Sequence, residues 1–314
     1  MTDKTSNLHI LGVPLDLGAE NLGVDMGPSA FRYQGLATKL STAGLPVTDL
    51  GDVACKRRAE VPVGNPKLRY LPEVIRVNEA IADKIEPVIA KGEKALVLGG
   101  DHSICLGAVA GASTALRGNI GVIYFDAHGD MNTDATSMTG NIHGMHLASL
   151  MGFGAPELAH VHGEAVKLQP KNLLHIGGCD LDQAEIDLMA REHIPNFTIF
   201  DLLSHGLSKL LPMIDALCRQ VDNVWISLDL DAIDALYAPG AGMPNQKGLT
   251  YREIAAIAEY IGQHCNVVGV DVVEYNPLQD VDRKTAGLAT ELIATFFGKQ
   301  YSWYTQYLAD NKKA

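Results

Sequence analysis

The sequence predicts an α/β fold of three layers, with helices covering both faces of a central and mostly parallel sheet. Short apolar segments typical of buried strands alternate with amphipathic helical segments along most of the chain. Of the residues, 47% are hydrophobic and 20% are charged, which suits a globular protein with a large core. We find no long linker and no internal repeat, so residues 1–314 are predicted to form one domain.

Apolar runs bounded by glycine, proline or polar residues mark the expected strands. In chain order these strands are 8–16, 45–53, 94–98, 120–125, 172–176, 197–200, 224–230 and 266–273. Most are short and apolar throughout, as expected of strands buried on both faces of a parallel sheet.

Helix boundaries are predicted from their end signals. Pro28 and Pro72 suit the first turn of a helix, where the missing N–H is not needed. Thr250 and Glu253 have the spacing of a capping box. Three expected helices have both bounds: 72–90, 208–220 and 286–297. For five more only the start is predicted: at Pro28, after Ser103, near His143, at Asp182 and after Thr250. Residues 57–71 are predicted to form a loop.

Composition excludes several classes of partner and location. The formal net charge of −12 argues against a general nucleic-acid or anionic-membrane partner. The five cysteines are scattered without C-x-x-C spacing, which favours buried free thiols in a reducing compartment over a disulfide framework. Residues 1–7 are polar, and no apolar run approaches the ~18 residues of a membrane span. A cytoplasmic location is therefore expected.

The stretch 124–130 carries the strongest chemical signal. Asp126, His128 and Asp130 follow an apolar strand at alternate positions, and in an extended backbone they would share one face. Charged groups beside a buried strand cost several kcal/mol unless they are compensated. A divalent cation is the simplest compensating group, and a solvated strand end is the alternative.

Further metal-competent side chains follow other strands. Taken alone, His102 would indicate a structural histidine, and Asp229 and Asp231 would suit turn caps. However, the carboxyl ends of parallel strands meet at one edge of a sheet, where ligands bind. The combined candidate ligands are His102, Asp126, His128, Asp130, Asp229 and Asp231. Four carboxylates and two imidazoles suit a pair of Mn²⁺-like ions, which can ionise a bridging water at neutral pH.

Three ordered motifs give the sequence a family resemblance. Residues 99–103 (GGDHS), 126–130 (DAHGD) and 227–234 (SLDLDAID) resemble the metal signatures of the ureohydrolases, and 23–30 (GVDMGPSA) also resembles arginases. The resemblance implies the three-layer fold that arginases and deacetylases share, and two Mn²⁺ per chain, with Co²⁺, Ni²⁺ or Fe²⁺ open. It implies that His102 and Asp130 bind one ion, that His128 and Asp231 bind the other, and that Asp126 and Asp229 bridge both.

The same resemblance implies a substrate and catalytic residues. Residues 131–143 form a loop rich in hydroxyl and amide donors, which suits a carboxylate ligand. The contacts expected for the α-carboxylate are Asn132, Ser137, Thr139 and Asn141, and the contact expected for the α-ammonium is Asp182, although Asp182 also suits a helix cap. Agmatine lacks the α-carboxylate, so L-arginine is favoured.

His143 is expected to shuttle protons, Glu274 to bind the guanidinium, and Asp130 to act as both ligand and catalytic residue. The implied reaction is attack of a metal-bridging hydroxide on the guanidinium carbon, which yields urea and L-ornithine.

Two departures from the arginase pattern bear on the substrate. Met243 stands where the family commonly has Thr, and His146 stands where arginases commonly have Pro. Three alternatives stay open: a ureohydrolase for agmatine, a guanidino acid or another guanidino compound; a related one-zinc deacetylase; and a non-enzymatic relative. The resemblance also suggests a homotrimer or homohexamer, with a small guanidino molecule as the binding partner.

Overall fold

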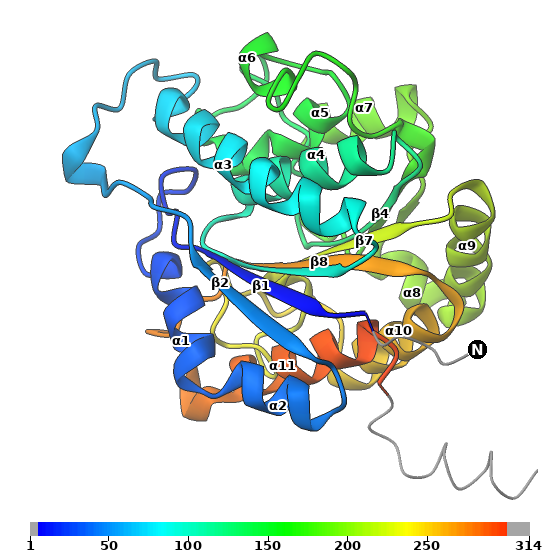
Figure 1. The fold of residues 1–314 in the computed structure, drawn as a ribbon. Coiled ribbons are helices and arrows are strands. Elements are labelled where there is room, and N and C mark those ends of the chain that lie inside the picture. Colours follow the sequence, from blue (N-terminus) through cyan, green and yellow to red (C-terminus); the bar gives the residue numbers. More distant parts are fainter. Residues whose placement is uncertain (1–5, 300–314) are drawn as a thin grey trace, which may run out of the picture.

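The computed structural model describes residues 6–299, which form one sheet with helices on both faces (Figure 1). The strands are β1 Leu8–Val13, β2 Val47–Asp52, β3 Lys94–Gly99, β4 Gly121–Phe125, β5 Leu173–Ile176, β6 Asn196–Phe197, β7 Val224–Asp229 and β8 Val267–Val273. The α-helices are α1 Gly27–Tyr33, α2 Leu36–Thr42, α3 Leu71–Ala90, α4 Cys105–Ala115, α5 His146–Leu150, α6 Pro156–Ala159, α7 Gln183–Arg191, α8 Ile199–His205, α9 Leu207–Gln220, α10 Tyr251–His264 and α11 Lys284–Phe296. The 3-10 helices are η1 Val24–Met26, η2 Arg58–Glu60, η3 His102–Ile104, η4 Ile142–Gly144, η5 Pro170–Asn172, η6 Leu230–Ala232 and η7 Val281–Arg283.

The sheet is parallel throughout, in the order β2-β1-β3-β8-β7-β4-β5-β6. The predicted three-layer α/β fold is therefore confirmed. This order makes β3, β8, β7 and β4 consecutive neighbours, although they lie far apart in the sequence. Their carboxyl ends therefore lie side by side at one edge, where open parallel sheets bind ligands.

Helices cover the two faces of the sheet in separate sets. One set, α3 to α7, lies on the upper face in Figure 1, and α1, α2, α8, α10 and α11 lie on the lower side. Helix α9 stands at the right of the sheet in this view and packs into the same core as α10 and α11. Side chains of one strand alternate between the two cores: Leu96 and Leu98 pack into one, and Ala95 and Val97 pack into the other. Burial of each larger side chain contributes roughly 1.5–3 kcal/mol.

Helix α4 is held closely against α3, and this contact fixes the segment that carries His102. A Cβ atom at Gly107 would lie 2.3 Å from the Asn78 carbonyl oxygen, so only glycine permits this approach. The Asn78 side chain accepts a hydrogen bond from the Gly107 N–H at 2.7 Å and donates one to the Val74 carbonyl at 2.9 Å. These contacts hold the first turn of α4 in place, and with it the preceding segment η3, which carries His102.

Two predictions about the chain are wrong. The segment expected to be a strand at 197–200 is a strand only as far as Phe197. Thr198 caps α8 with a capping box to Asp201, so Ile199 and Phe200 are helical. Cys218 and Cys265 form a disulfide across 47 residues of sequence, whereas all five cysteines were expected to be free. Cys55 and Cys179 are free but only half-buried.

The prediction of a cytoplasmic location rested on the polar N-terminus and on the lack of a membrane-spanning run. Residues 1–5, part of the polar N-terminus used in that prediction, lie outside the described residues. Among residues 6–299, no helix combines the length and apolar character that crossing a bilayer requires.

Candidate active site

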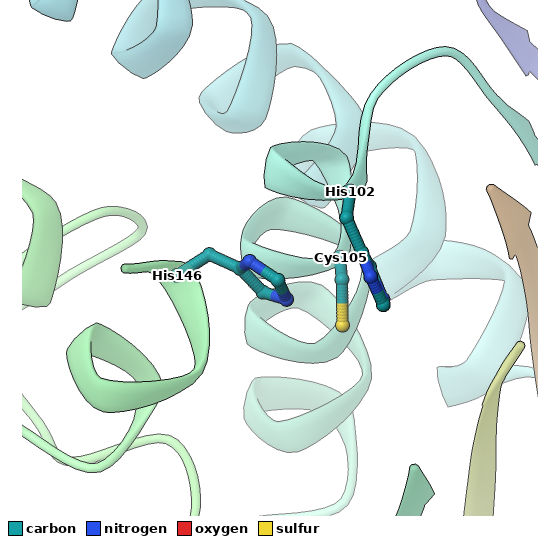
Figure 2. Close-up of side chains that lie close together, drawn as sticks. All are labelled: His102, Cys105 and His146. Carbon is teal, nitrogen blue, oxygen red and sulfur yellow. The ribbon is translucent and has the colours of Figure 1, made fainter. Parts of the chain in front are cut away.

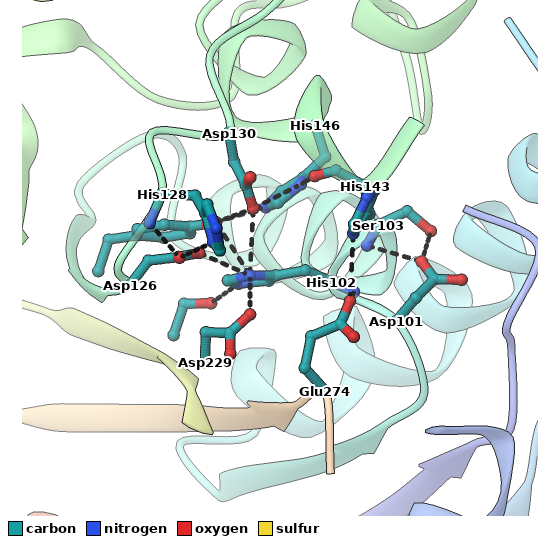
Figure 3. Close-up of polar contacts among 12 residues, drawn as sticks. Asp101, His102, Ser103, Asp126, His128, Asp130, His143, His146, Asp229 and Glu274 are labelled. Atoms are coloured by element: carbon teal, nitrogen blue, oxygen red, sulfur yellow. Dashed lines mark hydrogen bonds and ion pairs between the residues drawn. The ribbon is translucent and has the colours of Figure 1, made fainter. Parts of the chain in front are cut away.

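The candidate ligands follow three strands, β3, β4 and β7, and Glu274 follows a fourth, β8, so that all of them meet at the carboxyl edge of the sheet (Figure 3). His102 opens η3 after β3, and Glu274 follows β8. The segment after β4 supplies Asp126, His128 and Asp130, and the end of β7 supplies Asp229 and Asp231. The structure therefore brings together all six predicted ligand side chains.

The geometric reason given for Asp126, His128 and Asp130 is wrong, because β4 ends at Phe125. Asp130 has a φ of 52°, in the left-handed region, so the chain turns back on itself there and does not continue as a strand. The three side chains converge because of this turn. Glu274 also has a left-handed φ, 58°.

Four side chains form what we call the His102 group: His102, Asp126, Asp130 and Asp229. The Nδ1 atom of His102 lies 3.1 Å from Asp126 Oδ2, 3.2 Å from Asp130 Oδ2 and 3.2 Å from Asp229 Oδ2. In the described residues, the buried Oδ2 atom of Asp126 has no hydrogen-bond partner. One nitrogen and several carboxylate oxygens at these separations, one of them without a partner, fit around a divalent cation.

A second set, the His128 group, consists of Asp126, His128 and Asp231. The Nδ1 atom of His128 lies 3.3 Å from Asp126 Oδ1 and 3.1 Å from Asp231 Oδ2. The ligand atoms of this set lie within 4.8 Å of one another. Asp126 belongs to both groups, as expected of a bridging ligand. Asp229 was also expected to bridge; its Oδ2 faces His102 and its Oδ1 accepts the Asp231 N–H at 2.8 Å, much as Asp126 Oδ1 accepts the His128 N–H at 2.7 Å. Bridging by the two aspartates stays a prediction.

The acidic side chains of both groups are buried, which makes the charge balance unfavourable without a cation. Burial raises the pKa of Asp229, and the nearby Asp231 and Asp126 carboxylates raise it further. Burial and Asp126 likewise raise the pKa of Asp231 to about 6. Burial also raises the pKa of Asp126, but hydrogen bonds from His102 and His128 outweigh burial and lower it. The donor set therefore fits positively charged ions.

A hydrogen-bond chain behind His102 fixes its tautomer. Asp271 only accepts hydrogen bonds, so the Ser227 hydroxyl donates to it at 2.6 Å and in turn accepts the His102 Nε2–H at 2.8 Å. Trp225 Nε1 donates to the other Asp271 oxygen at 2.6 Å. One proton therefore sits on Nε2, and Nδ1 is the nitrogen that faces the carboxylates and would bind a metal ion in place of its own proton. Asp271 was not predicted, although a lone charge inside an apolar strand was an available signal.

A third set of metal-competent side chains, His102, Cys105 and His146, is fully buried behind the His102 group (Figure 2). His102 already faces the three aspartates of the His102 group through Nδ1, and it donates a hydrogen bond to Ser227 through Nε2. Both of its ring nitrogens are therefore engaged, and we assign no ion to this set. Burial, followed by the charge of His102, lowers the pKa of His146 to about 3, so its imidazole is neutral.

Above the two metal groups lies a pocket of about 200 Å³. It is lined by His128, Asp130, Asn132, Ser137, Met138, Thr139, Asn141, His143, Gly144, Asp180, Asp182, Glu185, Asp229, Asp231, Met243 and Glu274. Every predicted substrate contact therefore faces one cavity, together with Met243, one of the two departures from the arginase pattern.

The start of α7 places two acidic side chains at the pocket wall. Asp182 caps α7 in a capping box with Glu185, and it also accepts a hydrogen bond from Asn132 Nδ2 at 2.8 Å. Burial, followed by the charge of Asp130, raises the pKa of Glu185 to about 7. Glu185 was not predicted, although its spacing from Asp182 is that of a capping box.

His143 and Glu274 face each other on the other side of the pocket. His143 Nδ1 lies 3.3 Å from Glu274 Oε1, which also accepts the backbone N–H of His102 at 3.0 Å. Burial alone would lower the pKa of His143, but the hydrogen bond and charge of Glu274 outweigh burial and raise it to about 9. The other Glu274 oxygen packs against Gly242, where a Cβ atom would lie 2.4 Å away.

Two basic side chains hold the polar loop from outside, and we call them the Lys67–Arg69 clasp. Lys67 Nζ donates to the Ser137 carbonyl at 3.2 Å, and Arg69 Nη1 donates to Asn141 Oδ1 at 3.2 Å. The Arg69 backbone N–H also donates to the Gly140 carbonyl at 3.0 Å. The clasp was not predicted, because residues 57–71 carried only loop signals.

A parallel three-layer fold with two His/Asp groups beneath a polar pocket defines a hydrolase of the ureohydrolase class. Residues 6–298 match the Arginase family, and this chain belongs to that family. It is 40% identical to an arginase of Brevibacillus brevis over 93% of this chain and 98% of that protein.

Solved structures agree. The arginase of Bacillus caldovelox superposes with a TM-score of 0.89 at 38% identity, covering 95% of this chain and 100% of that chain. An Entamoeba histolytica arginase solved in complex with L-ornithine gives a TM-score of 0.84 at 30% identity, covering 93% and 99% of the two chains.

Proposed function

We propose that this chain hydrolyses the guanidino group of L-arginine to urea and L-ornithine, using two divalent cations held by the His102 and His128 groups. The observation that carries the proposal is the pair of His/Asp groups that share Asp126 beneath one pocket. Arginases at about 40% identity support the activity, and the related Entamoeba histolytica enzyme was solved with L-ornithine bound.

The cations are proposed to be Mn²⁺, with Co²⁺, Ni²⁺ or Fe²⁺ as alternatives. Each group offers one imidazole and two or more carboxylates, a donor set that suits these metals and leaves the choice among them loose. When bound, such a pair of ions activates water and stabilises the negative charge that develops during attack.

The guanidinium end of the substrate is assigned to Glu274 and His143. A carboxylate accepts hydrogen bonds from the planar guanidinium N–H groups, which orients the carbon for attack. With its pKa raised to about 9, His143 is protonated at neutral pH, so it holds a proton for the departing amine. His143 Nδ1 lies 3.3 Å from Glu274 Oε1 in the wall of the pocket, so the two side chains are proposed to act on the same end of the substrate.

The amino-acid end is assigned to the polar loop and to the start of α7. Asn132, Ser137, Thr139 and Asn141 offer hydroxyl and amide donors for the α-carboxylate. Asp182 is proposed to meet the α-ammonium, and Glu185 lies beside it with both oxygens already accepting backbone N–H groups. Agmatine has no α-carboxylate and would leave the loop donors unused.

One alternative substrate class has a specific observation in its favour. Met243 lines the pocket with 41% of its surface exposed, and it offers no hydroxyl to a guanidinium. A different guanidino compound is therefore the second candidate. Two complete His/Asp groups argue against a one-zinc deacetylase and against a non-enzymatic relative.

The deciding experiment measures urea release by Mn²⁺-reconstituted protein from L-arginine, agmatine and guanidino acids. The proposal predicts that L-arginine has the highest kcat/KM. A higher kcat/KM for agmatine than for L-arginine would identify agmatine as the preferred substrate. Absence of urea from every guanidine, with two ions bound, would favour the non-enzymatic relative.

Three further proposals concern organisation. We propose that residues 1–314 form one domain, that the protein acts in the cytoplasm and that it assembles as a homotrimer or homohexamer. Light scattering at several concentrations tests the assembly; a monomer at every concentration would contradict it.

A further inference from the structure

The hydroxyl of Tyr124 lies next to the His102 group without belonging to it. Tyr124 is a fully buried residue of β4, and its hydroxyl oxygen lies 2.7 Å from Asp130 Oδ2, 3.1 Å from His102 Nδ1 and 3.2 Å from His146 Nε2. Its ring stacks on the His102 imidazole with a centroid distance of 4.7 Å and an angle of 4° between the planes. This packing leaves the hydroxyl little freedom to move.

The surrounding hydrogen bonds decide where the single hydroxyl proton goes. His146 Nδ1 lies 2.6 Å from the His143 carbonyl, which only accepts, so the ring proton is on Nδ1 and Nε2 has a lone pair. His102 donates Nε2–H to Ser227, and its Nδ1 points at the Asp126, Asp130 and Asp229 carboxylates, where a proton or a bound ion occupies its lone pair. Two acceptors remain for the hydroxyl proton, and the Asp130 carboxylate oxygen at 2.7 Å is nearer than His146 Nε2 at 3.2 Å. A hydroxyl-to-carboxylate bond is the strong, charge-assisted kind, so the proton is donated to Asp130.

Asp130 needs such a restraint. Its left-handed backbone, with a φ of 52°, is strained for an aspartate and persists only where neighbouring groups hold it. The Leu147 N–H donates to the Asp130 carbonyl at 3.2 Å and holds the backbone. In residues 6–299, no other hydroxyl or amide donates to the Asp130 carboxylate, so Tyr124 provides its one hydrogen bond of this kind.

We propose that Tyr124 is a positioning residue that keeps the Asp130 carboxylate turned toward His102 and so completes the His102 cation position. The His146 ring lies beside the hydroxyl and is itself held by the hydrogen bond from its Nδ1–H to the His143 carbonyl, so it limits the space into which the hydroxyl could move. The inference rests on the proposed two-ion function. Loss of a hydrogen bond to a metal ligand commonly weakens metal binding by about 10–100-fold, and the ion next to Asp130 should bear that loss.

The test uses Mn²⁺ alone as the probe, without substrate. Metal-free wild type, Tyr124→Phe and Tyr275→Phe are titrated by calorimetry, and the spin coupling of neighbouring Mn²⁺ ions is followed by electron paramagnetic resonance. Tyr275 is a matched control: it is equally buried, but its hydroxyl donates to Asp280 at 2.8 Å, away from the metal groups. Melting temperatures establish that each variant is folded.

Wild type and Tyr275→Phe are expected to bind two ions with coupled spins. Tyr124→Phe should bind one ion as tightly as wild type and the other at least about tenfold more weakly. In an Asp130→Ala background, Tyr124→Phe should cause no further loss, because the hydroxyl acts through Asp130.

Three results would overturn the inference. Unchanged affinities for both ions in Tyr124→Phe would remove the positioning role while leaving the two-ion centre intact. If Tyr124→Phe binds both ions equally more weakly and also has a lower melting temperature, Tyr124 has only a structural role. Failure of wild type to bind two ions would reject the proposed centre itself, and the inference with it.

Discussion

The side-chain oxygen of Asn141 accepts a hydrogen bond from the Arg69 guanidinium, with an N···O distance of 3.2 Å. Because Arg69 carries only donors, it binds the oxygen of the amide and leaves the NH₂ group for the pocket. Asn141 therefore presents donors where an α-carboxylate is proposed to bind. Replacing Arg69 frees the amide to rotate and present its oxygen, which repels a carboxylate.

We expect Arg69→Gln to raise KM for L-arginine by about tenfold, the effect of one charge-assisted hydrogen bond worth roughly 1.4 kcal/mol, with kcat nearly unchanged. KM for agmatine should not change. Arg57→Gln is the control, because Arg57 lies on the same segment, is 85% exposed and pairs with Glu60. Equal increases in KM for L-arginine and agmatine would mean that Arg69 only holds the loop.

The charge of Asp182 is separable from its role as a helix cap. Asp182→Asn keeps a good capping residue at the start of α7 and removes the negative charge proposed to meet the α-ammonium. Steady-state kinetics should show KM for L-arginine rising about tenfold or more, and little change for a substrate without the α-amino group. If both substrates respond alike, the ammonium is recognised elsewhere.

His128 is the one imidazole of the His128 group, so His128→Asn should remove one ion and most turnover. Metal content per chain, measured by mass spectrometry after desalting, should fall from two ions to one. His205→Asn serves as the control, because His205 is exposed at the end of α8. Two retained ions in His128→Asn would reject the ligand assignment.

Metal uptake should depend on pH in a defined direction. Burial alone would lower the pKa of His102 and of His128, but hydrogen bonds to the neighbouring aspartates raise both well above the usual value. The metal-free centre therefore holds protons at neutral pH that a cation must displace, so apparent affinity rises with pH.

Calorimetry in two buffers of different ionisation heat measures this release directly. About one proton for each bound ion should be released at pH 7. Uptake without proton release would show that the imidazoles are already neutral.

The sequence predicted the fold well, because strands buried on both faces are short apolar runs. It predicted the ligands well, because polar residues directly after such runs must meet at one sheet edge. The sequence wrongly predicted a strand at 197–200, because this apolar run is too short to distinguish a strand from a helix. The capping box between Thr198 and Asp201 starts a helix there instead.

Long-range contacts were beyond prediction. The Cys218–Cys265 disulfide, the Lys67–Arg69 clasp and the Tyr124 contacts join segments whose pairing depends on the finished fold. At Asp130 the left-handed backbone falls on an aspartate, and the adjacent Gly129 does not have a positive φ, so the glycine does not mark the position.

The central claim is that His102, Asp126, Asp130, His128, Asp229 and Asp231 together hold two ions. Anomalous diffraction at the manganese edge from crystals of the Mn²⁺-loaded protein tests it most directly. We predict two peaks per chain, roughly 3.5–4 Å apart, one beside His102 and the other beside His128, with Asp126 between them. A single peak, or two peaks that do not share Asp126, would contradict the account.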